Sequence, residues 1–211
     1  MSAYITIVSG LPRSGTSMMM RMLDEGGIPI ITDRVRAADE DNPRGYYEFE
    51  PVKALKSKFD WLIDARGKAV KIVSRLLLEL PTGHYFRIVF MRRHLWEILA
   101  SQQKMLHRRG IFDDPPDNKQ MACLFRKHLE ETETWLRLQK QMQVIYVSYN
   151  DIISDPKFQA EIINRFLDKR LCVARMVEAV DSTLYRQRLE GNLSNDRNGL
   201  EISPPINLFP A

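Results

Sequence analysis

The fold of this chain is decided near its N-terminus, by Tyr4-Ile5-Thr6-Ile7-Val8, Ser9-Gly10-Leu11-Pro12-Arg13-Ser14-Gly15-Thr16-Ser17 and Met18-Met19-Met20-Arg21-Met22-Leu23. The first segment is apolar and β-branched, which is typical of a buried strand. The last has apolar residues at helical spacing and precedes Gly26-Gly27, so it predicts a helix that stops there. A strand, a glycine-containing turn and a helix in this order favour an anion site at the start of the helix.

The turn itself has the residues of a phosphate-binding loop. Gly10 and Gly15 allow successive backbone N–H groups to converge on an anion. The spacing fits Gly-x-x-x-x-Gly followed by hydroxyl residues, although Thr16 stands where a nucleotide kinase has Lys. Arg13 is the only cation of this turn, and its planar guanidinium suits an oxyanion. The alternative is a strand–turn–helix junction whose glycines only shape the turn.

Length and composition fit one globular domain: 211 residues, 44% of them hydrophobic and 27% charged. The net charge of +4 suits an anionic ligand, but it is too small and too scattered to indicate nucleic-acid binding. No apolar run approaches the roughly 18 residues of a membrane span, and nothing at the N-terminus resembles a signal peptide. Cys123 and Cys172 fall in helical patterns, so we expect two reduced core residues of a cytoplasmic protein.

Strands and helices alternate along the rest of the chain. We expect strands at residues 28–32, 69–73, 86–91 and 143–147, and helices at residues 51–65, 75–80, 95–109, 118–141, 156–167 and 172–180. This alternation predicts a single α/β domain over residues 1–190, with a mostly parallel central sheet flanked by helices. The polar, proline-containing residues 191–211 predict an irregular tail.

The strand expected at residues 86–91 ends in Arg92-Arg93. A metal-dependent NTPase would have an Asp after such a strand to hold Mg²⁺. Two guanidinium groups at this place, together with the missing loop Lys, argue against a metal-dependent phosphoryl transferase. The four His residues lack the spacing of metal ligands, so we expect no metal site.

Three motifs in this order resemble the sulfotransferase family, including its bacterial sulfotransferase-like branch. Pro12-Arg13-Ser14-Gly15-Thr16-Ser17 resembles the loop that binds the donor's 5′-phosphosulfate. Arg93 with Ser101 eight residues later resembles the pair that binds the 3′-phosphate, although His94-Leu95 stand where the family has Asn-Pro or Asp-Pro. Ser148-Tyr149-Asn150-Asp151, followed by Asp155-Pro156, resembles a late Tyr-Glu-Asp-Leu…Asp-Pro segment. The resemblance covers Ile5 to Pro156 and implies a P-loop nucleoside triphosphate hydrolase-like fold of the sulfotransferase type.

The resemblance also implies an activity. The chain would move a sulfuryl group from 3′-phosphoadenylyl sulfate (PAPS) to a hydroxyl or amine and release adenosine 3′,5′-bisphosphate, without a metal. The acceptor would be a small molecule or glycan, with alcohols, phenols, amines, sugars and peptides all open; no nucleic acid or membrane partner is expected. The implied donor-binding residues are Arg13, Ser14, Gly15, Thr16, Ser17, Arg93, Ser101, Tyr149, Arg186 and Arg188. Met18 stands where the family commonly has the Trp that stacks on adenine.

A base must take the proton of the acceptor. Many cytosolic relatives use the His of a Lys-Thr-His motif, where this chain reads Lys71-Ile72-Val73. Asn42-Pro43-Arg44-Gly45-Tyr46-Tyr47-Glu48 resembles the Asn-Pro-x-Gly-Tyr-x-Glu segment of bacterial relatives, which implies Glu48 as the base and Glu50 as the alternative. Arg13 would stabilise the transferred group, and Tyr46 and Tyr47 would line the acceptor pocket.

Two other functions stay open at this point. A P-loop kinase of a small metabolite would bind ATP with Mg²⁺. A non-catalytic relative would bind adenosine bisphosphate or a partner protein without transferring a group.

Overall fold

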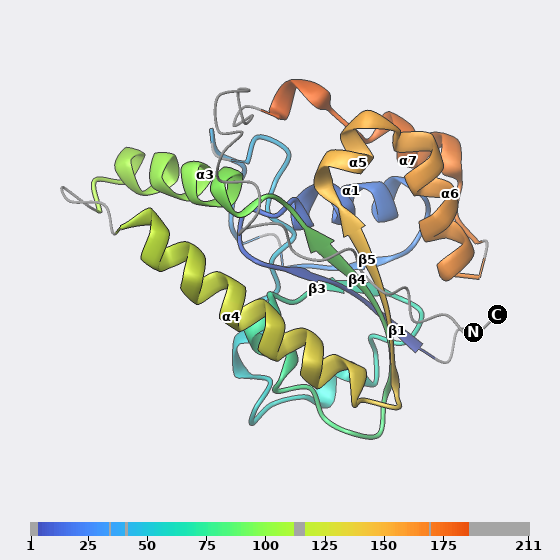
Figure 1. Ribbon diagram of the computed structural model, residues 1–211. Helices are drawn as coiled ribbons and strands as arrows, with labels where there is room; N and C mark the ends of the chain where they lie inside the picture. Colours follow the sequence, from blue (N-terminus) through green and yellow to red (C-terminus); the bar gives the residue numbers. More distant parts are fainter. Residues whose placement is uncertain (1–3, 34, 41, 112–116, 169, 186–211) are drawn as a thin grey trace.

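A five-stranded parallel sheet forms the centre of the computed structural model (Figure 1), which describes residues 4–33, 35–40, 42–111, 117–168 and 170–185. The strands are β1 (Tyr4–Gly10), β2 (Ile30–Ile31), β3 (Ala69–Lys71), β4 (Tyr85–Arg92) and β5 (Met142–Ser148). They are arranged in the order β2-β3-β1-β4-β5, and every neighbouring pair is parallel. The predicted fold class is therefore confirmed. The predicted tail, residues 191–211, lies outside the described residues.

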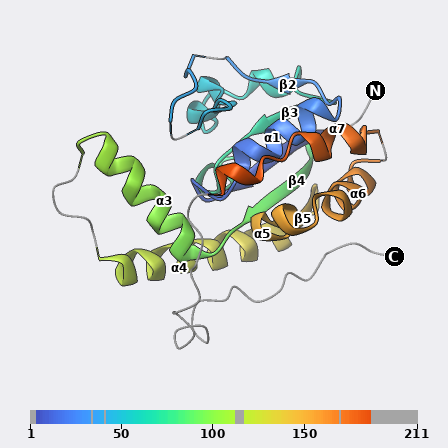
Figure 2. The same ribbon diagram turned by 90° about the horizontal axis from the view of Figure 1, so that it is seen from above.

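Helices cover both faces of the sheet. One face carries α1 (Thr16–Glu25), α5 (Tyr149–Ser154), α6 (Pro156–Phe166) and α7 (Val173–Glu178); the other carries α2 (Ser74–Leu77), α3 (Leu95–Arg108) and α4 (Asn118–Arg137). Figure 2 shows α1 beside α7 and α3 beside α4. Because both faces are covered, consecutive residues are buried along β1, from Ile5 to Gly10, and along β4, from Ile88 to Met91, as expected for a parallel sheet.

Alternate residues of each strand supply the two halves of the core. Ile7 and its partner Ile88 lie in the half that α4 covers, whereas Val8 and its partner Val89 lie in the half that α1 covers. All four side chains are fully buried. This alternation of side chains along a strand fixes the register of β1 against β4.

The strand order places a crevice between β1 and β4. The chain leaves β1 through α1 toward β2 on one side, and it leaves β4 through α3 and α4 toward β5 on the other. Connections that part in opposite directions open a crevice at the carboxyl ends of the two strands, and ligands of α/β sheets bind there. Residues 11–15, between β1 and α1, form the loop that we call the phosphate-binding loop after its predicted role. This loop follows β1, Arg92 ends β4 and Arg93 comes directly after it, so the loop and both arginines lie at this crevice.

The helix predicted at residues 51–65 is wrong. The structure has two short 3-10 helices there, Glu50–Ala54 and Asp60–Leu62, joined by turns. Leu62 is fully buried, but Ile63 next to it is 65% exposed, and Phe59 is exposed as well. The apolar spacing predicted one continuous helical face. In the structure, the buried residues Leu55 and Leu62 instead lie at the ends of two separate 3-10 helices.

The prediction of two core cysteines is also wrong, because Cys123 and Cys172 are both exposed; neither forms a disulfide. Cys123 lies on the outer side of α4, and Cys172 is the residue that precedes α7. Among the helices that the structure describes, none is long and apolar enough to cross a membrane.

Candidate functional site

The loop between β1 and α1 has three residues with positive φ, Gly10 at 143°, Arg13 at 72° and Gly15 at 97°. At Gly15 an added Cβ would lie 2.4 Å from the Tyr149 ring, and at Gly10 it would lie 2.6 Å from the carbonyl oxygen of Met91. Both glycines are therefore required by close neighbours as well as by backbone conformation. Tyr149, at the start of α5, covers the loop at Gly15.

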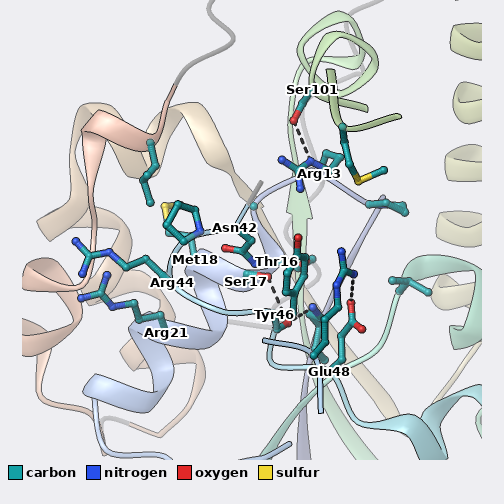
Figure 3. A pocket seen from close by; sticks show the side chains of 18 of the residues that line it. Arg13, Thr16, Ser17, Met18, Arg21, Asn42, Arg44, Tyr46, Glu48 and Ser101 are labelled. Atoms are coloured by element: carbon teal, nitrogen blue, oxygen red, sulfur yellow. Dashed lines mark hydrogen bonds and ion pairs between the residues drawn. The ribbon is translucent and has the colours of Figure 1, made fainter. Parts of the chain in front are cut away.

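A cavity of about 530 Å³ opens beside this loop. Figure 3 shows Thr16 and Ser17 in its middle, Met18, Arg21 and Arg44 on one side, and Arg13 with Ser101 on another. Its walls come from the loop, the polar segment of residues 36–53, the end of β3, one face of α3 and residues 179–184. The cavity thus lies at the carboxyl ends of the strands, where the topology predicts a ligand.

Arg13 and Ser101 meet in this cavity although 88 positions separate them. The Nε of Arg13 donates to the Oγ of Ser101 at 2.9 Å. Ser101 lies on the buried side of α3, two turns into that helix. The cation of the loop and the hydroxyl of the second motif therefore form one polar group.

Arg93 is buried against the back of the same loop. Its Nε donates to Oε2 of Glu97 at 2.9 Å, and its Nη1 donates to the backbone oxygen of Arg13 at 3.2 Å. The side chains of Arg93 and Glu97 are only 8% and 2% exposed. The Arg93 guanidinium also lies 4.4 Å from the centre of the Tyr149 ring. Arg93 therefore holds the loop in place besides lining the cavity.

Glu97 is the centre of a second set of hydrogen bonds. Its Oε1 accepts from the hydroxyl of Tyr185 at 2.6 Å and from the side-chain amide of Asn150 at 3.3 Å. Burial and the hydrogen bond to Glu97 raise the pKa of Tyr185 to about 12. Burial likewise raises the pKa of Tyr149, against the opposing influence of Arg93. Both phenols thus stay neutral at ordinary pH, and that of Tyr185 donates to Glu97.

A third cluster surrounds Tyr46. The hydroxyl of Ser17 donates to the Tyr46 backbone oxygen at 3.4 Å, and the Lys71 ammonium donates to the same oxygen. The Arg36 guanidinium lies 3.3 Å from the centre of the Tyr46 ring and donates to Glu48 at 2.9 Å. Glu48 is therefore ion-paired with Arg36. Through its backbone carbonyl, Tyr46 connects the polar segment that contains Glu48 to Ser17, at the start of α1 (Figure 3).

Lys71 has a strongly shifted pKa. Burial lowers it to about 8; Glu48 opposes the shift and Arg36 reinforces it. Lys71 forms no ion pair with any described residue. A substantial share of its amine is therefore neutral slightly above neutral pH, unlike an ordinary lysine.

The walls of the cavity are strongly cationic. Ten described lining residues are Arg or Lys and four are Asp or Glu, an excess of six positive charges. The whole chain has a net charge of only +4, so the rest of it has a net charge of −2. The positive charge is thus gathered at the cavity, as a polyanionic ligand would require.

Most of the predicted site residues line this one cavity: Arg13, Gly15, Thr16, Ser17, Arg93, Ser101, Tyr149, Glu48 and the alternative Glu50. Ser14 does not, because its side chain is fully buried and its hydroxyl faces Gly10. Tyr46 lines the cavity, whereas Tyr47, at φ 51°, packs into the core half that α1 covers. Arg186 and Arg188 lie outside the described residues.

Sequence reasoning missed Arg36, Lys71 and Glu97. Lys71 ends β3, and the rule that ligands bind at the carboxyl ends of strands would have found it. Glu97 lies four residues after Arg93, a spacing at which opposite charges pair on a helix. Arg36 had no such signal, because its contact with Glu48 depends on how the long polar segment folds back. Among described residues, no three His, Cys, Asp or Glu side chains could hold a metal ion.

Residues 87–200, more than half of the chain, match the family described as the sulfotransferase domain. The chain belongs to the sulfotransferase domain family. The matched residues include Arg93, Ser101 and Tyr149, whereas the phosphate-binding loop and Glu48 precede them. Among curated proteins, none matches this sulfotransferase chain.

The solved structures that resemble it include two sulfotransferase domains. The sulfotransferase domain from the Synechococcus PCC 7002 olefin synthase has 12% identity and a TM-score of 0.50, over 98% of this chain and 91% of that one. The sulfotransferase domain from the curacin biosynthetic pathway has 13% identity and a TM-score of 0.47, over 78% of this chain and 74% of that one. At such low identity the first of these shows a shared fold and no more.

Substitution of Gly15 tests whether Tyr149 covers the loop between β1 and α1. Gly15→Ala must accept both a positive φ and a Cβ at 2.4 Å from the ring, whereas Gly45→Ala meets only a positive φ of 88° with open space around it. We expect Gly45→Ala to cost about 1 kcal/mol and Gly15→Ala about 1–3 kcal/mol more. Urea unfolding measures both; equal losses would contradict the proposed close contact.

Lys71 gives a pH-dependent prediction. Between pH 8 and 10.5, its folded and ordinary pKa values, the folded chain has released this proton and the unfolded chain still holds it. Stability therefore rises with pH across this window, by up to about 3 kcal/mol. In Lys71→Met this rise is absent. Unfolding free energies of both proteins between pH 7 and 10 measure the difference, and parallel curves would refute it.

Proposed function

We propose that this chain is a PAPS-dependent sulfotransferase. The family gives the reaction class, and the observation that carries the proposal is the 2.9 Å contact between Arg13 and Ser101. It brings the phosphate-binding loop and the second motif into one cationic cavity. A donor with anionic groups on the 5′ and 3′ oxygens of one ribose needs two adjacent anion sites of this kind.

The residues present fit such a donor. The first turn of α1, with Thr16, Ser17 and the cation of Arg13, would hold the 5′-phosphosulfate. Ser101 and Arg13 would contact the 3′-phosphate, Arg93 would support them from behind the loop, and Tyr149 would lie between the two anionic groups. Oε1 of Gln102, a lining residue next to Ser101, is buried and has no hydrogen-bond partner among described residues, so a ligand hydroxyl or amine would satisfy it. Arg186 and Arg188 are proposed to add cations from beyond the described residues.

Arg93 would act mainly by positioning. Two of its nitrogens are engaged by Glu97 and by the backbone of Arg13, and the Glu97 carboxylate would repel an approaching phosphate. Arg13 and Ser101 are then the residues that meet the 3′-phosphate side most directly. This division of roles makes Arg13 and Ser101 better test positions than Arg93, whose loss would leave Glu97 buried without its cation.

The bound donor supplies an activated sulfuryl group. In the proposed reaction the acceptor oxygen or nitrogen forms a bond to sulfur while the bond to the 5′-phosphate oxygen breaks, and adenosine 3′,5′-bisphosphate leaves. Glu48 would take the acceptor's proton, because it lines the cavity beside Tyr46, whose carbonyl contacts Ser17. Backbone N–H groups, Arg13 and the hydroxyls of Thr16 and Ser17 would hold the developing charge. Glu50 is the alternative base, although it is more exposed and pairs with Lys53.

Binding of the product nucleotide tests the donor site. Adenosine 3′,5′-bisphosphate at about 100 times its Kd should stabilise the chain by about 2.7 kcal/mol, a rise of several degrees in Tm. Because a hydrogen bond to a charged group contributes about 1.5–3 kcal/mol, Arg13→Ala should weaken binding by more than about tenfold, and Ser101→Ala should weaken it less. Arg175→Ala, an exposed position on α7, is the control that loses the same charge. A shift with ATP and Mg²⁺, but none with the bisphosphate, would favour a kinase and overturn the proposal.

The proposed base has its own test. Glu48→Gln keeps the shape of the side chain and removes its basicity, so kcat for bisphosphate release with an acceptor should fall about 10²–10⁴-fold. The thermal shift with bisphosphate should be unchanged, since Glu48 is not proposed to touch the nucleotide. Glu50→Gln is the matched control. A large loss in Glu50→Gln instead would assign the base to Glu50, and unchanged rates in both would indicate another base.

A further inference from the structure

Lys71 is a partly buried amine that the proposed reaction does not use. It is the last residue of β3 and lies on the same face of that strand as Ala69, in the half of the molecule that α1 covers. Lys71 lines the cavity and donates to the backbone oxygen of Tyr46, and the hydroxyl of Ser17 donates to the same oxygen at 3.4 Å. Two hydrogen bonds to one oxygen place the amine within about 6 Å of the Ser17 hydroxyl.

The ammonium form of Lys71 has little support from neighbouring charges. Among the described residues, Glu48 is the carboxylate whose charge acts on Lys71, and Glu48 already pairs with Arg36 at 2.9 Å. Arg36 itself disfavours a second positive charge beside it. The centre of the Tyr46 ring lies 6.0 Å from the Lys71 nitrogen. A desolvated lysine beside another cation is an activated nucleophile, because much of its amine is neutral.

The neutral share of the amine is large at moderate pH. Burial lowers the pKa of Lys71 to about 8, so about half of its amine is neutral at that pH. A lysine with the ordinary pKa of 10.5 would be neutral in less than about 1% of molecules at the same pH. Lys71 therefore combines access to the cavity with the reactivity of a free amine.

The surroundings of Lys71 select the electrophiles that reach it. Among the described lining residues, ten cations stand against four carboxylates, so the cavity attracts anions and gives neutral reagents no such advantage. An anion held beside Ser17, at the start of α1, lies next to the Lys71 amine. In an acyl phosphate the reactive carbonyl carbon is only two bonds from phosphorus. A phosphate group bound at this place therefore brings a carbonyl carbon within reach of the amine.

We propose that Lys71 is a site of acylation by acyl phosphates, and that this modification weakens binding of the donor nucleotide. The neutral amine forms a bond to the carbonyl carbon while the bond from that carbon to the phosphate oxygen breaks. Phosphate leaves with the electron pair of the broken bond and takes up the proton that the amine releases. The product is a neutral amide, so the cavity loses one positive charge and gains an acyl group beside Ser17. The acylation does not depend on the proposed function, whereas its effect on the donor rests on it.

Acetyl phosphate, added to the full chain, tests the acylation site. Peptide mass spectrometry measures the rate of acetylation at Lys71 and at Lys157, an exposed lysine of α6 that serves as the reference. At pH 8 we expect Lys71 to react about tenfold faster than Lys157, because its amine is activated and the cavity collects the reagent. The rate at Lys71 should level off above about pH 9, where its amine is almost wholly neutral.

A neutral reagent separates the effect of the cavity from that of the amine. With N-acetoxysuccinimide the ratio of the two rates should be about fivefold smaller, and salt should lower the ratio only for acetyl phosphate. Acetylation of Lys71 that is no faster than that of Lys157, or an equal ratio with both reagents, would overturn the acylation site.

Two variants test the effect on the donor. Lys71→Gln places a neutral amide at this position, and Lys71→Arg keeps a positive charge that acyl phosphates do not acylate. The acetylated chain and Lys71→Gln should both bind adenosine 3′,5′-bisphosphate about tenfold more weakly than the untreated chain. Treatment with acetyl phosphate should leave the Kd of Lys71→Arg where it was.

The outcomes separate this inference from the proposed function. An unchanged Kd for the bisphosphate after acetylation of Lys71 would overturn the effect on the donor and leave the donor site standing. Failure of the bisphosphate to bind the untreated chain would overturn the proposed function together with that effect. The acylation site would still be decided by the rates at Lys71 and Lys157.

Discussion

The buried fork of Arg93 is the interaction on which the site depends. One nitrogen pairs with Glu97, four residues later in the first turns of α3, and another holds the carbonyl of Arg13. The start of a helix favours a carboxylate such as Glu97, and removing one partner of a buried pair costs about 3–5 kcal/mol. Arg93 and Glu97 therefore form one unit, and a change at either position disturbs the phosphate-binding loop.

That loop is held from three directions. Arg93 holds it from the end of β4, the Tyr149 ring covers it at Gly15, and Tyr185 reaches Glu97 from the C-terminal side of the described chain. Residues as far apart as 13 and 185 thus converge on a loop whose Arg13 has a left-handed backbone conformation. Such support fixes the donors of the loop before any ligand arrives, and it lowers the cost of ordering them on binding.

The sequence was sufficient for the framework of the fold. Apolar runs predicted β1, β4 and β5 because parallel strands that are buried on both faces are rich in apolar residues. The same reasoning failed at residues 51–65, where Leu62 is buried and Ile63 is exposed, because spacing does not reveal a chain that turns between short 3-10 helices. It failed again for Cys123, on an exposed face of α4, and for Cys172, just before α7, since a small apolar residue is tolerated at exposed positions.

Some residues of the candidate site could likewise be predicted from the sequence, and others could not. Arg13, Arg93 and Tyr149 follow strand ends, and the topology of a parallel sheet brings such residues to one edge whatever their separation in sequence. Glu97 and Lys71 were equally accessible to this reasoning, through helical spacing and a strand end. The pairing of Arg36 with Glu48 was not, because it needs the path of a long polar segment. Sequence patterns therefore predict the positions of residues on strands and helices. Contacts between residues of irregular segments can be seen only in the folded structure.

The position of the loop cation explains why α3 is part of this site. A Lys at position 16 would begin α1 and place a compact charge over the helix start. In this chain Thr16 occupies that position and the cation is Arg13, in the turn, whose side chain extends to Ser101. A planar guanidinium donates in several fixed directions, so it can contact the Ser101 hydroxyl and still present charge to the cavity, which an ammonium does less well. With its cation at position 13 instead of position 16, the loop places its positive charge nearer to α3 than to the start of α1. Lys104 and Arg108 of α3 line the same cavity and add to this charge.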